Sequence, residues 1–243
     1  YSLVISSAIF PIYYGLIFSE INFISFFGYQ IKNTAVISFI TAIAFVVVAF
    51  ISPILSGIAD YIGNKKRFMK IFVYVGSISC VGLYWFELQT IYLGLFFYFF
   101  ALIGLWASLV FYNSYLPDIA YPDQQDFASA RGFSYGYIGS VILLLINLII
   151  IMNPNSFGIE GSGSEASMTA MKYSFISVGI WWALFSQYSF YFLPKSNREV
   201  KVTKDIFWNG YKELKLVFKE LKNQTKLKRF LPAFFLYSMA LQT

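Results

Sequence analysis

Long apolar stretches separated by short polar connections run along this chain. Six of these stretches carry no Asp, Glu, Lys or Arg away from their ends. A helix needs about 20 mainly apolar residues to cross the hydrocarbon core of a bilayer, whereas the strands of a membrane barrel alternate apolar and polar residues in shorter segments. The pattern therefore predicts an all-α, polytopic membrane protein. The expected spans are 2–18, 36–59, 71–86, 91–112, 132–152 and 173–193.

The segments after the sixth span predict a linker and a further span. Within 204–228, apolar residues recur at steps of three and four and lysines occupy much of the remaining circumference, which predicts an amphipathic helix on a membrane surface. The first apolar stretch starts abruptly at Tyr1 and a seventh stops at Thr243, so we expect the sequence to be a fragment. The expected parts are a six-span bundle at 1–193, a basic amphipathic linker at 194–229 and the start of a truncated seventh span at 230–243.

Composition supports a membrane protein that embeds in a lipid bilayer, and it excludes several classes of function. Hydrophobic residues make up 58% of the chain and charged residues 12%, against about 25% charged residues in soluble domains. No nucleic-acid partner is expected, because topology and anionic lipid explain the net charge of +6. Without histidine there is no His-based triad or His metal site, and the single Cys80 cannot form an intrachain disulfide. Since the spans also lack clustered acids and nucleophile–base pairs, we expect no enzyme, cofactor or metal.

Positive residues are distributed unequally between alternate connections. Sixteen of the 18 Lys and Arg lie in the connections at 60–70, 113–131 and 194–229. Basic residues favour the cytoplasmic side of a membrane, so these three connections are expected to be cytoplasmic. In a bacterium, the membrane would be the plasma (inner) membrane. The alternate connections, which include 19–35 and 153–172, then face outward.

Glycines and tryptophans carry three further expectations. Gly132, Gly136 and Gly139 step along one face of the fifth span and predict a close-packing surface. The Trp pair at 181–182 in the sixth span is expected to face lipid. The glycine- and serine-rich segment 153–170 is expected to be a flexible outer loop.

The connection after the second span carries a charged motif that contains Asp60, Gly63 and the run Lys65-Lys66-Arg67. A tight loop on the positive side of a membrane explains the glycine and the cations, but it gives the acid no role. The motif resembles that of the major facilitator superfamily, Gly-x-x-x-Asp-x-x-Gly-x-basic-basic, with a serine in place of the first glycine. In that superfamily the loop joins two six-helix halves, and it forms and breaks as the carrier changes state. The resemblance implies a gating loop with Asp60 as its acidic member and Lys65, Lys66 and Arg67 as its basic members.

Two later segments resemble one branch of that superfamily. They are Phe-Tyr-Asn-Ser-Tyr-Leu-Pro-Asp-Ile-Ala at 111–120 and Ser-Ala-Arg-Gly-Phe-Ser-Tyr-Gly-Tyr-Ile-Gly-Ser at 129–140. These segments and the opening span at 1–18 are similar to the branch that contains the fungal vacuolar amino-acid effluxers of autophagy and their bacterial relatives. The resemblance implies the six-helix N-terminal half of a twelve-span fold. The missing C-terminal half of the same protein would then be its partner.

The candidate solute site consists of neutral polar groups, because the spans offer no ionisable side chain. In the superfamily, the first, second, fourth and fifth spans of each half line the central cavity. The candidates on those spans are Ser6, Ser7, Tyr13, Tyr14, Thr41, Asn113, Ser134, Tyr135 and Asn147. Each has a structural alternative: serine and threonine bond to their own helix, tyrosine favours the membrane interface, and the amide of Asn147 can join two helices.

The leading functional hypothesis is a secondary carrier that moves a small polar solute by alternating access. Amino acids are the first candidate substrate, through the resemblance alone. The alternatives are a sugar–cation symporter of a related branch and a membrane scaffold or sensor that transports nothing.

Overall fold

The computed structural model of this chain describes residues 8–19, 21–26, 28–62, 65–161, 163–194, 215, 219, 224, 228–230 and 233, with only the backbone at 26 and at 58–62. Most of the expected linker and truncated seventh span lie outside the described residues, as do Ser6, Ser7 and Gly63. The chain divides into two compact units. The first contains Tyr1–Ala49 and Lys66–Lys195, and the second contains Phe50–Lys65 and Ser196–Thr243.

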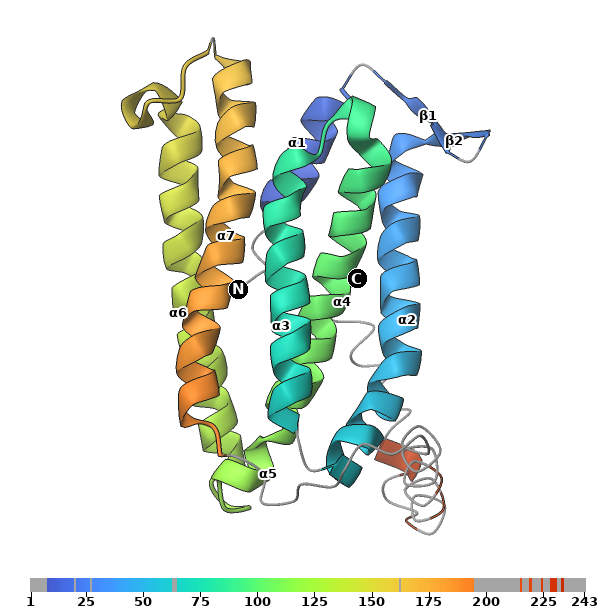
Figure 1. The fold of residues 1–243 in the computed structure, drawn as a ribbon, viewed down its shortest axis with the longest axis vertical. Helices are drawn as coiled ribbons and strands as arrows, with labels where there is room; N and C mark the ends of the chain where they lie inside the picture. Colours follow the sequence, from blue (N-terminus) through green and yellow to red (C-terminus); the bar gives the residue numbers. More distant parts are fainter. Residues whose placement is uncertain are drawn as a thin grey trace. The chain divides into compact units, whose positions relative to one another are not determined.

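Long helices dominate the described residues (Figure 1). The elements are α1 (Phe10–Ile17), β1 (Phe23–Phe26), β2 (Tyr29–Lys32), α2 (Asn33–Ile62), α3 (Lys65–Gly82), η2 (Leu83–Trp85), η3 (Leu88–Thr90), α4 (Ile91–Ser114), α5 (Leu116–Ile119), α6 (Gln125–Met152), η4 (Pro154–Phe157) and α7 (Ser164–Phe192). In the second unit, α2 continues through Pro53 to Ile62.

Four helical segments in the described part of the chain are long and apolar enough to cross a bilayer: Asn33–Gly57, Lys65–Trp85, Leu88–Ile119 and Gln125–Met152. Helix α7 has 29 residues, and its serines, tyrosines and tryptophans lower its mean hydropathy. At 1.5 Å per residue it is still about 44 Å long, enough to cross a bilayer. The prediction of an all-α, polytopic membrane fold is therefore confirmed.

The outer surface of the first unit is apolar. Large side chains such as Phe39 on α2, Phe96 on α4, Leu145 on α6 and Leu184 on α7 are exposed. A soluble monomer rarely exposes contiguous apolar patches of this extent, whereas lipid is the natural environment for such a surface. These side chains are therefore expected to contact lipid or other transmembrane segments.

The core of the first unit forms around the aromatic residues of α1. Phe10 stacks on Tyr98 of α4 with ring centroids 4.2 Å apart, and Tyr13 packs edge-on against Phe175 of α7 at 5.2 Å. Phe86, between η2 and η3, also stacks on Phe10, with ring centroids 5.6 Å apart. These buried rings fix α1 against α4 and α7.

Glycines bring α3 close to both α4 and α7, which lie on either side of it (Figure 1). A Cβ built on Gly104 of α4 would lie 2.5 Å from the Cα of Gly76 on α3, and one on Gly179 of α7 would lie 2.7 Å from the carbonyl oxygen of Ser77. Backbones approach this closely only where no side chain intervenes. The tightest of these helix contacts therefore involve glycines other than the expected set at 132–139, although a Cβ on Gly132 would meet the Tyr112 hydroxyl at 2.6 Å.

The sixth span differs from two expectations. Trp182 is buried against Gly76 of α3 instead of facing lipid, because the missing side chain of the glycine leaves room for the indole. The neighbouring Trp181 is only partly buried and packs against the hydrophobic core. Helix α7 already begins at Ser164, so the connection after α6 is shorter than the expected loop at 153–170. Its glycines at 158, 161 and 163 all have positive φ, a conformation that glycine adopts without strain.

The connection at 19–35 contains an antiparallel hairpin that the hydropathy pattern did not predict. Strands β1 and β2 pair with Phe23 opposite Lys32, Ile24 opposite Ile31 and Phe26 opposite Tyr29. Gly28, in the turn, has a φ of 86°. The hairpin joins the end of α1 to the beginning of α2 (Figure 1).

Candidate functional site

Two of the predicted site residues, Tyr13 and Tyr14, lie on α1 and are buried. The Tyr13 hydroxyl donates a 2.7 Å hydrogen bond to the carbonyl oxygen of Phe86, and the Tyr14 hydroxyl donates one of 2.8 Å to the carbonyl oxygen of Asn33. Each tyrosine thus uses its only hydroxyl proton to hold α1 against a neighbouring element. A solute could therefore form hydrogen bonds with these two hydroxyls only by donating a proton to their oxygen atoms.

Thr41 on α2 meets Tyr98 on α4. Its hydroxyl donates to the carbonyl oxygen of Ile37, one turn earlier, at 2.8 Å, and lies 3.2 Å from the Tyr98 hydroxyl. Because the threonine has one proton and has already donated it, Tyr98 must be the donor in the second contact. This pair joins α2 to α4, and stacking of Phe10 on Tyr98 brings α1 to the same place. Tyr98 was not among the site residues predicted from sequence. The only sequence signal for it is its position on the fourth span, which is expected to line the cavity.

Asn147 on α6 is 1% exposed and faces α7. Its amide nitrogen donates to the carbonyl oxygen of Leu143 at 3.0 Å, and its amide oxygen lies 2.9 Å from the hydroxyl of Ser177 on α7. Ser177 has a second acceptor in reach, the carbonyl oxygen of Ser174 at 2.8 Å. This geometry fits the structural alternative, in which the amide joins two helices inside the membrane.

The other three candidates lie on exposed surface. Asn113 is near the end of α4, while Ser134 and Tyr135 are in the first part of α6. The Ser134 hydroxyl donates to the carbonyl oxygen of Ala130 on its own helix at 2.8 Å, and Tyr135 is 68% exposed. The structure therefore brings Tyr13, Tyr14 and Thr41 into one neighbourhood around Phe10. In contrast, Asn113, Ser134 and Tyr135 are on exposed surface of α4 and α6.

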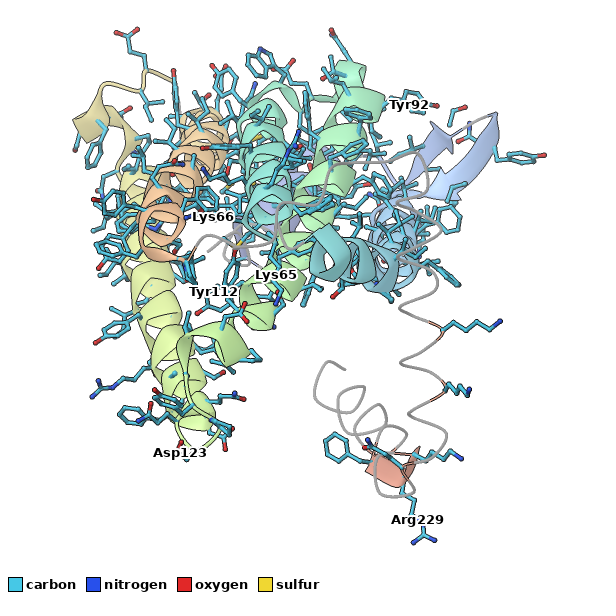
Figure 2. All side chains as sticks on the ribbon, turned by 60° about the horizontal axis from the view of Figure 1, so that its bottom comes forward. Lys65, Lys66, Tyr92, Tyr112, Asp123 and Arg229 are labelled. Carbon is cyan, nitrogen blue, oxygen red and sulfur yellow. The ribbon has the colours of Figure 1, made fainter. Side chains whose placement is uncertain are left out.

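The basic end of α3 contacts the last turn of α7. The Lys66 ammonium donates a 2.8 Å hydrogen bond to the carbonyl oxygen of Leu193, and the Lys70 ammonium lies 5.3 Å from the ring centre of Phe190. One turn further along α3, the Tyr74 hydroxyl donates to the side-chain oxygen of Gln187 at 3.1 Å. Figure 2 views the bundle with this end brought forward and labels Lys66. A cation at this position also satisfies the partial negative charge of a helix C-terminus.

Beyond the other end of α3, an ion pair joins α7 to the connection between η2 and η3. Lys172 lies 2.5 Å from Glu87 and 5.3 Å from the ring centre of Tyr84. Glu87 also forms a capping box with Thr90 at the start of η3. Together with the glycine contacts between the two helices and the Lys66 contact, these contacts link α7 to α3 and to the connection that follows α3. We call this set of contacts the α3–α7 seam.

The predicted gating loop is described only in part. Asp60 lies in the last turns of α2 with its side chain outside the described atoms, and Gly63 is outside the described residues. Lys65, Lys66 and Arg67 begin α3. Among the described residues, no group of three or more His, Cys, Asp or Glu could hold a metal ion.

Comparisons with known proteins give a consistent relationship. A family model described as "Vacuole effluxer Atg22 like" matches residues 18–243. An uncharacterized MFS-type transporter of Bacillus subtilis, YxiO, is 32% identical over 242 residues, which cover 98% of this chain and 53% of that protein. An uncharacterized protein of Aquifex aeolicus is 31% identical over 109 residues, covering 44% of this chain and 27% of its own length. No solved structure matches. The chain thus spans about half the length of the Bacillus relative.

Proposed function

This chain belongs to the Atg22-like vacuole effluxer family, a branch of the major facilitator superfamily, and from that premise we propose that the whole protein is a secondary carrier. It would move a small polar solute across the membrane by alternating access, with amino acids as the first candidate class. The relationship to an MFS-type transporter over 98% of the chain carries this proposal. In such carriers two halves move around a central site, and this chain would supply one half.

We propose that the solute contacts neutral polar groups on α1, α2 and α4. Acidic and basic side chains occur only toward the ends of the described helices, so a charged solute would find its counter-charge in another part of the protein. The Thr41–Tyr98 pair is the best placed group, because the Tyr98 oxygen keeps its acceptor capacity. Asn113, Ser134, Tyr135 and Asn147 remain candidates that could contribute from α4 and α6.

The α3–α7 seam supports a half that moves as one body. The glycine contacts and the Lys66 contact resist sliding of α3 past α7, and the Lys172–Glu87 ion pair holds α7 to the connection that follows η2. In the proposed gating loop, Asp60 is the acid and Lys65, Lys66 and Arg67 are the cations. Asp60 lies near the end of α2, and the three cations begin α3. We place this loop, 113–131 and the linker on the cytoplasmic side, because of their basic residues.

A thermal-shift screen of the purified full-length protein tests the substrate class. The panel contains amino acids, dipeptides and sugars. A solute present at ten times its Kd adds about 1.4 kcal/mol to the free energy of unfolding. We expect stabilisation by amino acids, and loss of that shift in Thr41→Val. The matched control is Ser140→Ala, which removes a hydroxyl that bonds only to the Gly136 carbonyl of its own helix.

The screen also separates the alternatives. A shift with sugars alone would favour a sugar–cation symporter of a related branch. No shift with any solute would favour a membrane scaffold or sensor.

A further inference from the structure

The β1–β2 hairpin is held firmly at its base. The side-chain nitrogen of Asn33 donates to the carbonyl oxygens of Phe18 and Ile21, at 3.3 and 2.8 Å, and so joins the end of α1 to the start of α2. The backbone nitrogen of Asn33 donates to the carbonyl oxygen of Asn22 at 3.0 Å. Tyr92, labelled in Figure 2, donates to the carbonyl oxygen of Ser25 at 3.2 Å and connects the hairpin to α4. These bonds give the hairpin a defined direction.

The strand register separates two faces. Ile24 and Ile31 are directly opposite each other and pack against the hydrophobic core of the bundle. Side chains alternate between faces along a strand, so Tyr29, two residues before Ile31, lies on that same face. We call it the inner face. The outer face carries Ser25, Gln30, Lys32 and, at its base, Phe23.

The inner face is covered by the bundle at the base of the hairpin and is exposed at its tip. Near the base it covers the core, but at the tip Tyr29 is 74% exposed. Four residues of strand extend about 13 Å, more than the radius of a helix. Figure 1 shows the hairpin directed away from α4 at the end of the bundle where α2 begins. The inner face therefore extends past the bundle at the tip, where Tyr29 is exposed.

The α2 helix that follows the hairpin has exposed apolar side chains in its first turns. Phe39, less than two turns after Asn33, is 60% exposed, as expected for a side chain that contacts lipid. The hairpin joins the ends of two spans, so it lies at the depth where a bilayer changes from hydrocarbon to headgroups, a zone of roughly 5–7 Å on each side. Tyrosine is enriched at this depth because its ring is apolar and its hydroxyl is polar.

We propose that the inner face of the β1–β2 hairpin is a membrane-binding surface, with Tyr29 inserted among phospholipid headgroups beside α2. The partner is the lipid surface itself. The hairpin leads directly into α2, whose exposed Phe39 follows within two turns, so the two lie close to the same lipid boundary. The outer face, with Ser25, Gln30 and Lys32 and with Phe23 at its base, faces the water. This proposal does not depend on the proposed transport activity.

Site-specific fluorescence tests the proposal in the full-length protein reconstituted in liposomes. In a cysteine-free background, in which Cys80→Ala is combined with replacement of any cysteine in the rest of the protein, Tyr29→Cys and Gln30→Cys are each labelled with an environment-sensitive dye. Gln30→Cys is the matched control, because Gln30 is next to Tyr29 in the strand but lies on the outer face. Quenching is measured with phosphatidylcholine that carries a nitroxide at its headgroup, and with iodide in the water.

We expect the dye at position 29 to show blue-shifted emission, strong quenching by the nitroxide lipid and little quenching by iodide. The dye at position 30 should show the reverse. Equal iodide quenching at both positions would overturn the proposal, because the tip would then be in water. Protection of position 29 from both quenchers would also overturn it, because another part of the protein would then cover the inner face.

Discussion

Lys66 at the start of α3 donates a 2.8 Å hydrogen bond to the carbonyl oxygen of Leu193, directly after α7. The two residues are far apart in sequence, and their contact fixes the point at which the chain leaves the sixth span. The same lysine belongs to the motif that sequence resemblance assigns to the gating loop. The contact therefore joins one cation of that motif to the residue that directly precedes the expected linker.

Neutralising this lysine should loosen the end of α7. We expect Lys66→Met to lower the free energy of unfolding by about 1 kcal/mol, because hydrogen bonds to charged groups contribute about 1.5–3 kcal/mol when buried and less when partly exposed. Thermal unfolding in detergent measures the change. Lys32→Met, which removes an exposed lysine on the hairpin, is the control. Equal melting temperatures for the two variants would show that the Lys66 contact adds no stability.

The glycine contact between α3 and α4 should not tolerate a side chain. Gly104→Ala places a Cβ 2.5 Å from the backbone of Gly76, and overpacking of this kind typically costs about 1–3 kcal/mol. Gly15→Ala on α1 is the control, because a Cβ there meets nothing within 4 Å and alanine favours a helix over glycine by about 1 kcal/mol. Opposite shifts in melting temperature are expected, and a neutral Gly104→Ala would contradict the close packing.

The Asn147–Ser177 hydrogen bond should couple α6 to α7. A double-mutant cycle with Asn147→Ala and Ser177→Ala is expected to give a coupling energy of about 0.6 kcal/mol, the average for such bonds inside membranes. Unfolding in mixed micelles measures each variant. If the two changes are additive while Asn147→Ala weakens stabilisation by solute, the amide would have a role in the solute site instead.

The two ends of the first unit should face opposite sides of the membrane. In a cysteine-free background, with Cys80→Ala and replacement of any cysteine in the rest of the protein, Asn155→Cys, after α6, should react with an impermeant maleimide added outside intact cells. Asp123→Cys, before α6 and labelled in Figure 2, should react only after the cells are opened. The expectation follows from the basic residues at the Asp123 end. The reverse pattern of labelling would invert the topology.

Hydropathy predicted the helices well, because a helix is the structure that satisfies the backbone of a continuous apolar segment in lipid. It did not predict which helices touch. Gly76, Gly104 and Gly179 are spaced across three helices, so their contacts depend on the arrangement of those helices and leave no local pattern. The expected glycine face at 132–139 was visible in sequence because its members share one helix.

The hairpin and the seam were missed for different reasons. Four-residue strands are too short for alternation to stand out, and only Gly28 marked the turn. The partner of Lys66 is a main-chain carbonyl, which every residue has. Of the predicted site residues, Tyr13, Tyr14 and Thr41 lie together because α1 packs against α2 and α4, an arrangement that sequence alone did not provide.

The measurement that tests the central claim most directly is solute counterflow in proteoliposomes of the full-length protein. Vesicles loaded with an unlabelled amino acid should accumulate the labelled form from outside, and Asp60→Asn should change the rate while protein insertion, measured by protease protection, stays the same. An alternating-access carrier with Asp60 in its gating loop predicts both results. No counterflow with any solute of the panel would contradict the transport function, and unchanged counterflow in Asp60→Asn would contradict the role of the loop.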